Sequence, residues 1–228
     1  MLRVEVAVSD VDGVRVAREA GAHRVELCVA LEVGGLTPSL ALVEHAVAAA
    51  EGMGVHVLLR SRPGDFVVDA AELDVTLRDA ELVLAAGAAG IVVGPLLAGG
   101  RFDLAAMARL RDLAGDAQLT AHRGFDVRTD VEDAVADLVE VGVDRILTSG
   151  GAASAHDGVE RIARAVAAAD GRLTVMAGGG IRPEFVDDLV ARTGIADVHL
   201  SGRSLVAPDE GFGARHRTDP AVLARVIR

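Results

Sequence analysis

The chain has 228 residues, of which 51% are hydrophobic but only 2% aromatic, so it suits one large domain with an aliphatic core. All 23 basic residues are arginine, and without lysine the chain cannot form a Schiff base, attach pyridoxal phosphate or build a P-loop. We therefore expect no nucleotide cofactor. A net charge of −11 also argues against nucleic-acid binding, which needs a basic surface.

Short apolar runs typical of strands recur along the chain, and each precedes a longer segment in which Ala, Leu and Val have helical spacing. The runs are Leu2–Val8, Arg24–Cys28, Val55–Arg60, Gly90–Gly94, Gln118–His122, Asp144–Thr148, Arg172–Met176 and Asp197–Leu200. Their starts are about 28 residues apart on average, close to one strand–helix unit.

Eight such units predict a TIM (β/α)8 barrel, with an open doubly wound sheet as the alternative. No linker divides the chain, so we expect a single domain over residues 1–228. The barrel should occupy about residues 1–204, and a C-terminal tail and helix residues 205–228.

The junctions between the units also repeat. Glycines that fit left-handed helix ends lie two or three residues before five of the strands, at Gly21, Gly87, Gly115, Gly142 and Gly194. Thr37-Pro38 and Arg182-Pro183 place proline where a first helical residue would stand, so helices should begin there.

The sequence also bears on location. Charges interrupt the first residues where a signal peptide would be apolar, and no uncharged stretch is long enough to span a bilayer. The lone cysteine cannot form an internal disulfide, which fits a reducing compartment. We expect a cytoplasmic protein that does not bind a membrane.

Alternation along the strands predicts which side chains enter the barrel, because the outer face must be apolar to pack on helices. The polar or reactive side chains predicted to face inward are Glu5, Ser9, Arg24, Glu26, Cys28, His56, Arg60, Thr120, His122, His199 and Ser201. These side chains could simply pair with one another in the barrel interior. Since they come from five strands, we favour a ligand or catalytic site at the C-terminal mouth.

Several loops at that mouth have residues suited to binding. Gly178, Gly179 and Gly180 follow the seventh strand and Ser201 the eighth, a place where many barrels hold phosphate; a tight turn is the alternative. Thr148 ends the sixth strand and is a further candidate ligand-binding residue.

Two arginine-containing segments add to these candidates. His122 could be a general base or a ligand, and Asp126 could orient it or Arg123; a core histidine with a capping aspartate is equally consistent. Arg60 and Arg62 suit a carboxylate or phosphate on a ligand, or else they pair with acidic neighbours.

Cys28 is the only thiol, and thiolates favour Cu(I). Together with His56, His122 or His199 it could hold that ion. A lone cysteine is more often a small buried hydrophobe, so from the residues alone metal binding is the weaker interpretation.

Together the motifs resemble the CutC copper homeostasis proteins. The matching pieces, in order, are Arg24–Cys28, Gly34–Ser39, Val55–Val57 with Arg60 and Arg62, Gly64–Phe66, His122-Arg123 with Phe125-Asp126, Asp144–Gly150 and Gly178–Gly180. The resemblance implies a TIM barrel, a cytoplasmic location and a homodimer or higher homo-oligomer.

Two functional hypotheses follow. The resemblance implies copper homeostasis, with copper bound by Cys28 and one or more of the three histidines. The lumen residues favour an enzyme or binding protein for a small anionic or polyhydroxylated metabolite. There Glu26 or His122 would be the acid or base, Arg60 would clamp the ligand, and Gly178–Gly180 would hold a phosphate.

Overall fold

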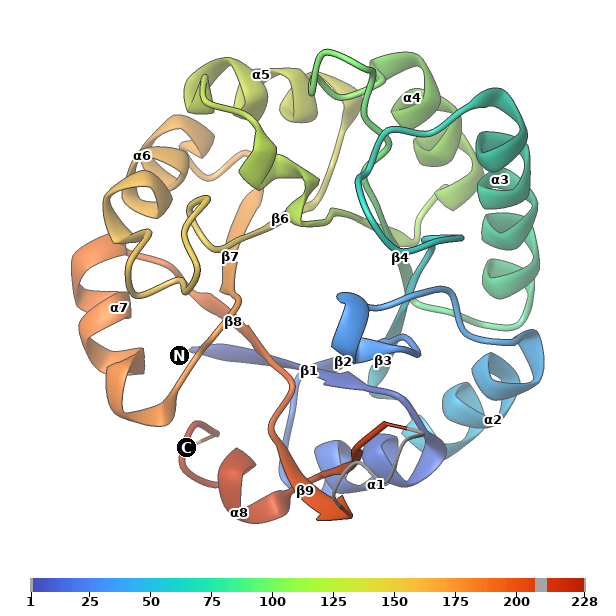
Figure 1. The fold of residues 1–228 in the computed structure, drawn as a ribbon, viewed down its shortest axis with the longest axis vertical. Coiled ribbons are helices and arrows are strands. Elements are labelled where there is room, and N and C mark those ends of the chain that lie inside the picture. The colour runs from blue at the N-terminus through green and yellow to red at the C-terminus, as the bar shows by residue number, and fades with distance from the viewer. Residues whose placement is uncertain (1, 208–212, 228) are drawn as a thin grey trace.

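A computed structural model describes residues 2–207 and 213–227 and shows a closed barrel of eight parallel strands surrounded by helices (Figure 1). The strands are β1 (Arg3–Val8), β2 (Arg24–Leu27), β3 (Gly54–Leu58), β4 (Gly90–Val93), β5 (Gln118–Ala121), β6 (Arg145–Thr148), β7 (Thr174–Gly178) and β8 (Asp197–Leu200). They pair in chain order and β8 pairs with β1, which closes the barrel. The predicted TIM barrel is therefore confirmed, and the open sheet is excluded.

The outer helices are α1 (Val11–Glu19), α2 (Leu40–Ala50), α3 (Ala70–Ala85), α4 (Leu104–Ala114), α5 (Val131–Val141), α6 (Val159–Ala169), α7 (Val186–Thr193) and α8 (Pro220–Leu223). Short 3-10 helices lie in three of the loops: η1 (Leu31–Val33), η2 (Arg123–Val127) and η3 (Pro183–Phe185). No helix within the described residues is long and apolar enough to cross a membrane.

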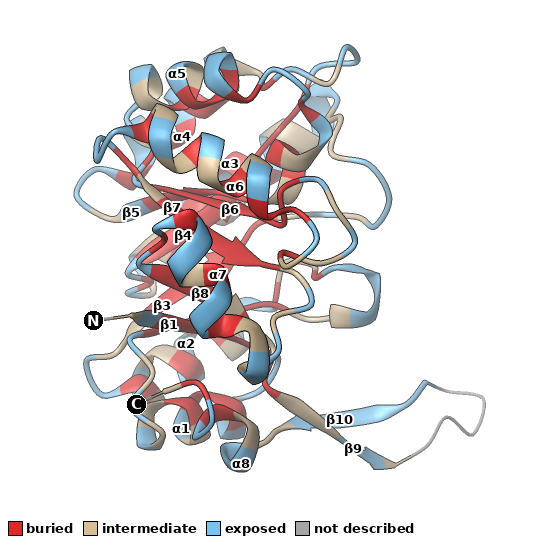
Figure 2. Ribbon diagram, turned by 90° about the vertical axis from the view of Figure 1, so that its left-hand side faces the viewer, coloured by how far each residue is buried: buried red, intermediate tan, exposed pale blue. Residues whose placement is uncertain are grey.

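The predicted alternation of the strands is confirmed by what each face contacts. Val4, Val6 and Val8 belong to a continuous aliphatic core between strands and helices, as do the outward residues of the other strands. A separate small cluster of Cys28, Leu58 and Val92 lies inside the barrel. Figure 2 shows the resulting pattern, with buried strands inside and helices exposed on their outer faces.

The start of α2 differs from the sequence prediction. The helix begins at Leu40, and its cap is Ser39, whose side chain accepts a hydrogen bond from the N–H of Leu42. Thr37 is instead tied to the end of β3: its hydroxyl accepts from the N–H of Arg60 at 2.8 Å, and its own N–H donates to the carbonyl of Arg60 at 3.0 Å. These bonds hold Thr37 outside the helix. The helix start predicted at Arg182-Pro183 is correct, because Pro183 is the first residue of η3.

β7 also lies two residues beyond its predicted position, which keeps the predicted alternation. Arg172 was assigned to the strand, but its guanidinium donates to the carbonyls of Ala168 and Ala169 at the end of α6. Those carbonyls have no partner within the helix, and a cation there is favourable. All five predicted cap glycines have a positive φ, and Gly142 and Gly194 end α5 and α7 in the left-handed conformation. Gly115 at the end of α4 departs from it, with a ψ of −115°.

The segment expected as a tail contains an antiparallel hairpin of β9 (Arg203–Ala207) and β10 (Arg215–Thr218), followed by α8. The hairpin extends away from the barrel wall (Figure 2), and Leu205 and Val206 are exposed on it. Residues 208–212 and 228 of the predicted tail lie outside the described residues.

We predict that Ser39→Ala lowers the free energy of unfolding in urea by about 1 kcal/mol, because the substitution removes the cap of α2. Ser61→Ala is the control, since Ser61 is exposed and its side chain forms no hydrogen bond with the rest of the described chain. Equal stability of the Ser39 variant and the wild type would show that Ser39 does not cap the helix.

Candidate functional site

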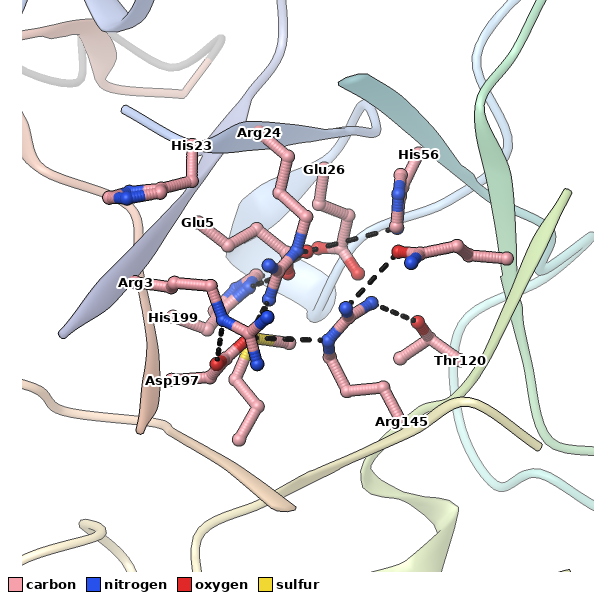
Figure 3. A network of polar contacts seen from close by, with 12 residues as sticks. Arg3, Glu5, His23, Arg24, Glu26, His56, Thr120, Arg145, Asp197 and His199 are labelled. Atoms are coloured by element: carbon pink, nitrogen blue, oxygen red, sulfur yellow. Dashed lines mark hydrogen bonds and ion pairs between the residues drawn. The ribbon is translucent and has the colours of Figure 1, made fainter. Parts of the chain in front are cut away.

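Strand register places the charged side chains of the lumen next to one another. Glu5 on β1 lies beside Arg24 on β2 and beside His199 on β8, while Glu26 on β2 lies beside His56 on β3. Figure 3 shows these residues converging inside the barrel. The predicted convergence of Glu5, Glu26, His56 and His199 is therefore confirmed.

The lower part of this network, toward the N-terminal ends of the strands, is built around Asp197. Its carboxylate accepts from Arg3 at 2.7 Å and from Arg24 at 2.6 Å, and the Nε of Arg145 lies 3.4 Å away. Arg24 also donates to Glu5 at 2.6 Å. Asp197 and Glu5 are fully buried, so these contacts compensate the cost of removing their charges from water.

The upper part consists of Glu5, His199 and Glu26. His199 Nδ1 donates to Glu5 Oε1 at 2.7 Å, which leaves His199 Nε2 3.7 Å from Glu26 Oε2. One ligand atom from each of the three residues lies within 4.8 Å of the others, so this cluster could hold a metal ion. A carboxylate that fixes the far nitrogen of a histidine is a common support for a metal ligand.

Protonation separates the two glutamates. Burial would raise the pKa of Glu5, but the hydrogen bond from His199 and the nearby cations hold it well below its usual value. Burial raises the pKa of Glu26 to about 7, since His199 offsets the effect only in part and the charge of Glu5 adds to it. Burial would lower the pKa of His199, but Glu26 and Glu5 raise it above the usual range. Glu26 can thus gain or lose a proton near neutral pH.

A pocket of about 700 Å³ opens above this cluster at the C-terminal mouth. Nine of the predicted site residues line it: Glu26, Arg60, His122, Arg123, Asp126, Gly179, Gly180, His199 and Ser201. The other predicted residues (Glu5, Cys28, His56, Arg62, Thr148 and Gly178) support or surround it without contributing to its wall. Apolar side chains, including Leu58, Phe66 and Leu147, cover much of the remaining wall.

Arg60 lines the pocket, but most of its guanidinium donors are already used within the protein. Its guanidinium donates to the carbonyls of Val33, Gly35 and Gly64 and lies 5.0 Å from the ring centre of Phe66. These contacts tie together the loops that follow β2 and β3. The neighbouring Arg62 pairs with Asp65 and Glu72, so the anticipated pairing with acidic neighbours applies to this arginine.

Asp126 is held by a dense set of donors. Its carboxylate accepts from the Thr148 hydroxyl, from the N–H groups of Ser149 and Gly151, and from Arg123 Nε at 2.9 Å. Thr148 is fully buried, and its hydroxyl helps to hold the Asp126 carboxylate in place. An acceptor occupied in this way is a poor general base, and Asp126 orients Arg123 rather than His122.

His122 and Cys28 occupy different environments. His122 Nδ1 accepts from the N–H of Gly124, and burial lowers the pKa of His122 to about 4, so its ring is neutral with the proton on Nε2. Cys28 packs closely against Gly35. A Cβ added to Gly35 would lie only 2.6 Å from the Leu58 side chain and 3.4 Å from Cys28 Sγ. Burial is the main reason that the pKa of the Cys28 thiol is raised, and the charge of Glu26 raises it further. Among the residues described, Cys28 belongs to no group of three candidate metal ligands.

Sequence reasoning missed part of the site. Asp197 and Arg145 lie in predicted strands but were not predicted as site residues, and neither was Arg203, which follows the eighth strand. The register Glu5–His199 places Asp197 two residues earlier on the same inner face, so alternation applied to β8 could have found it. The position of Arg203 depends on the hairpin and could not be found in this way.

Comparisons with known proteins agree with this architecture. The profile of the CutC family matches residues 2–204. The chain belongs to the CutC family. A CutC protein of Sinorhizobium medicae is 43% identical over 96% of this chain and 91% of its own length. The CutC protein of Rhizobium meliloti is 41% identical, again over 96% of this chain and over 92% of its own length.

A solved structure of CutC from Streptococcus agalactiae, whose name proposes copper homeostasis for that protein, superposes with a TM-score of 0.84. Its sequence is 28% identical, and the match covers 88% of this chain and 99% of that one. The shared fold over nearly the whole relative shows that the barrel is the conserved architecture of both proteins.

We predict that Asp197→Asn lowers the free energy of unfolding by about 3–5 kcal/mol, because the buried guanidinium groups lose their compensating charge while the side chain keeps its shape. Urea titration measures the change. Glu132→Gln breaks the exposed pair with Arg164 and should change stability little. Equal effects of the two substitutions would contradict this role of Asp197.

Proposed function

We propose that this CutC protein binds a small anionic, hydroxylated metabolite at the barrel mouth and that Glu26 transfers a proton to or from it. One observation carries the proposal: the Glu26 side chain is almost fully buried, lines the pocket, and forms no hydrogen bond with the described residues, while its pKa is raised to about 7. A general acid or base works best when its pKa lies near the working pH.

The neighbours of Glu26 support proton transfer. Glu5 fixes the orientation of His199, and His199 Nε2 points toward the Glu26 carboxylate, so the two groups can share a proton. The neutral His122 lines the same pocket with its Nε2–H available as a donor. A carboxylate base and a neutral imidazole donor are together suited to removing a proton beside a carbonyl and stabilising the resulting oxyanion.

The composition restricts the chemistry further. Without lysine the chain cannot activate a carbonyl as a lysine Schiff base, and the proposed reaction relies on acids, bases and hydrogen-bond donors instead. The charged side chains around the pocket include three arginines, Arg60, Arg123 and Arg203, against the carboxylates of Glu26 and Asp126. The mouth is therefore much more basic than the chain as a whole, which favours an anionic ligand.

The test is exchange of carbon-bound hydrogen in D2O, followed by NMR, with a panel of sugar phosphates and hydroxycarboxylates as probes. We expect a probe that exchanges faster with the protein, at a rate that rises as pH increases through about 7 and Glu26 loses its proton. Glu26→Gln should retain binding of that probe and lose the exchange, because an amide cannot act as the base.

Glu44→Gln is the matched control, since Glu44 is exposed on α2 and does not line the pocket. Exchange that continues unchanged in the Glu26 variant would reject the role of Glu26. Failure of every probe to bind to the wild type would reject the choice of metabolite class.

Copper homeostasis is the second candidate function. It is supported by the name of the Streptococcus agalactiae relative and by the cluster of Glu5, Glu26 and His199. Carboxylate and imidazole ligands suit Cu(II) better than Cu(I), whereas the buried Cys28 thiol with its raised pKa is a poor soft ligand here. The cytoplasmic location and the homo-oligomer stay predictions.

For copper, we predict that calorimetric titration with Cu(II) shows a stoichiometric site that His199→Gln removes and Cys28→Ala leaves intact. His45→Gln is the control, because His45 is exposed on α2. The opposite result, loss of binding in the Cys28 variant alone, would assign copper to the thiol instead of the carboxylate–histidine cluster.

A further inference from the structure

Arg123 presents one unpartnered nitrogen to the mouth pocket. Its Nε donates to Asp126 at 2.9 Å and its Nη2 donates to Ser149 Oγ at 2.8 Å. Its Nη1 forms no hydrogen bond with any described residue and lies against Gly179, where an added Cβ would be only 3.2 Å from it. Both Arg123 and Gly179 line the pocket, so this nitrogen is placed for a ligand.

The orientation of this guanidinium is fixed in advance. Asp126 cannot turn without losing the hydrogen bonds from Thr148, Ser149 and Gly151. Arg123 is held by Asp126 on one side and by Ser149 on the other. A cation held in place loses little conformational freedom when it binds an anion, which favours affinity. Arg60 differs, because its Nη1 and Nη2 groups already bind backbone carbonyls.

The loop beside Arg123 supplies further donors. The backbone N–H groups of Gly179, Gly180 and Ile181 find no acceptor within the described chain. Gly179 and Gly180 have φ values of +95° and +65°, conformations that favour glycine. Successive free N–H groups in such a turn form a concave site that binds anions.

We propose that Arg123 and the loop Gly179–Ile181 hold the oxyanion of the ligand, a phosphate or a carboxylate, and that Asp126 is the residue that positions Arg123. This inference rests on the proposed function, since it names the group by which the metabolite is anchored. The anchor lies at the ends of β5 and β7, whereas Glu26 projects from β2. A ligand held there would extend across the mouth toward the base (Figure 1).

The experiment measures the dissociation constants of inorganic phosphate and of malonate by calorimetry, on the full-length protein. Arg123→Gln should weaken binding of the preferred anion about tenfold or more, because a charge-assisted pair is lost. Arg164→Gln is the matched control, since Arg164 is exposed on α6 and pairs with Glu132 outside the pocket. The anion with the lower dissociation constant shows whether the anchored group is a phosphate or a carboxylate.

Asp126 is tested by a double-mutant cycle. Asp126→Asn should weaken binding of the same anion, while the double variant Arg123→Gln/Asp126→Asn should bind no more weakly than Arg123→Gln alone. A merely structural role of Asp126 would add its effect to that of Arg123. Additive effects would therefore overturn the positioning role.

Two further outcomes would overturn the anion site: no saturable binding of either anion to the wild type, or binding that is equal in the Arg123 and Arg164 variants. These results differ from failure of the proposed function. If Arg123→Gln loses anion binding while Glu26→Gln leaves the exchange unaffected, the anion site at Arg123 is supported and the role of Glu26 as the base is rejected.

Discussion

The buried carboxylates of Glu5 and Asp197 are the constraint on which this barrel depends. Each is completely removed from water, and each is compensated by Arg24, which bridges them with two hydrogen bonds of 2.6 Å. The strands supply these residues from β1, β2 and β8, so the network forms only when the sheet closes. An aliphatic shell with only five phenylalanines surrounds it and provides most of the apolar burial.

The lumen is divided along the barrel axis. In the lower part, Arg3, Arg24 and Arg145 surround the carboxylates of Asp197 and Glu5, so the groups there support the fold. In the upper part, Glu26 lies at the floor of the pocket without a hydrogen bond from the described residues, and burial favours its neutral form. Two glutamates on adjacent strands thus have opposite pKa shifts, which is the pattern expected when one residue orients and the other exchanges a proton.

The arginines show how one residue type serves several purposes. Arg24 and Arg145 compensate charge in the lumen, and Arg60 joins two loops through carbonyl groups. Arg123 keeps one nitrogen without a partner among the described residues, because Asp126 and Ser149 occupy only the other two. The fork of donors on a guanidinium makes such divided use possible, and an ammonium group could not replace it.

The sequence by itself determined the fold and the inner face of the barrel. Strand spacing predicted the eight units, and alternation placed Glu5, Glu26, His56 and His199 inside, because both signals depend on local geometry. It also identified most of the pocket wall, since the C-terminal ends of parallel strands meet at one mouth.

Only the tertiary structure decided what each inward group contacts. Alternation cannot say that the Nη groups of Arg60 are used by carbonyls of two loops, that Asp126 is saturated with donors, or that Cys28 is covered by Gly35 and Leu58. The start of α2 at Leu40 likewise depends on the bonds between Thr37 and Arg60, 23 residues apart. Hydrogen-bond partners and desolvation are set by residues distant in the chain, so local patterns cannot specify them.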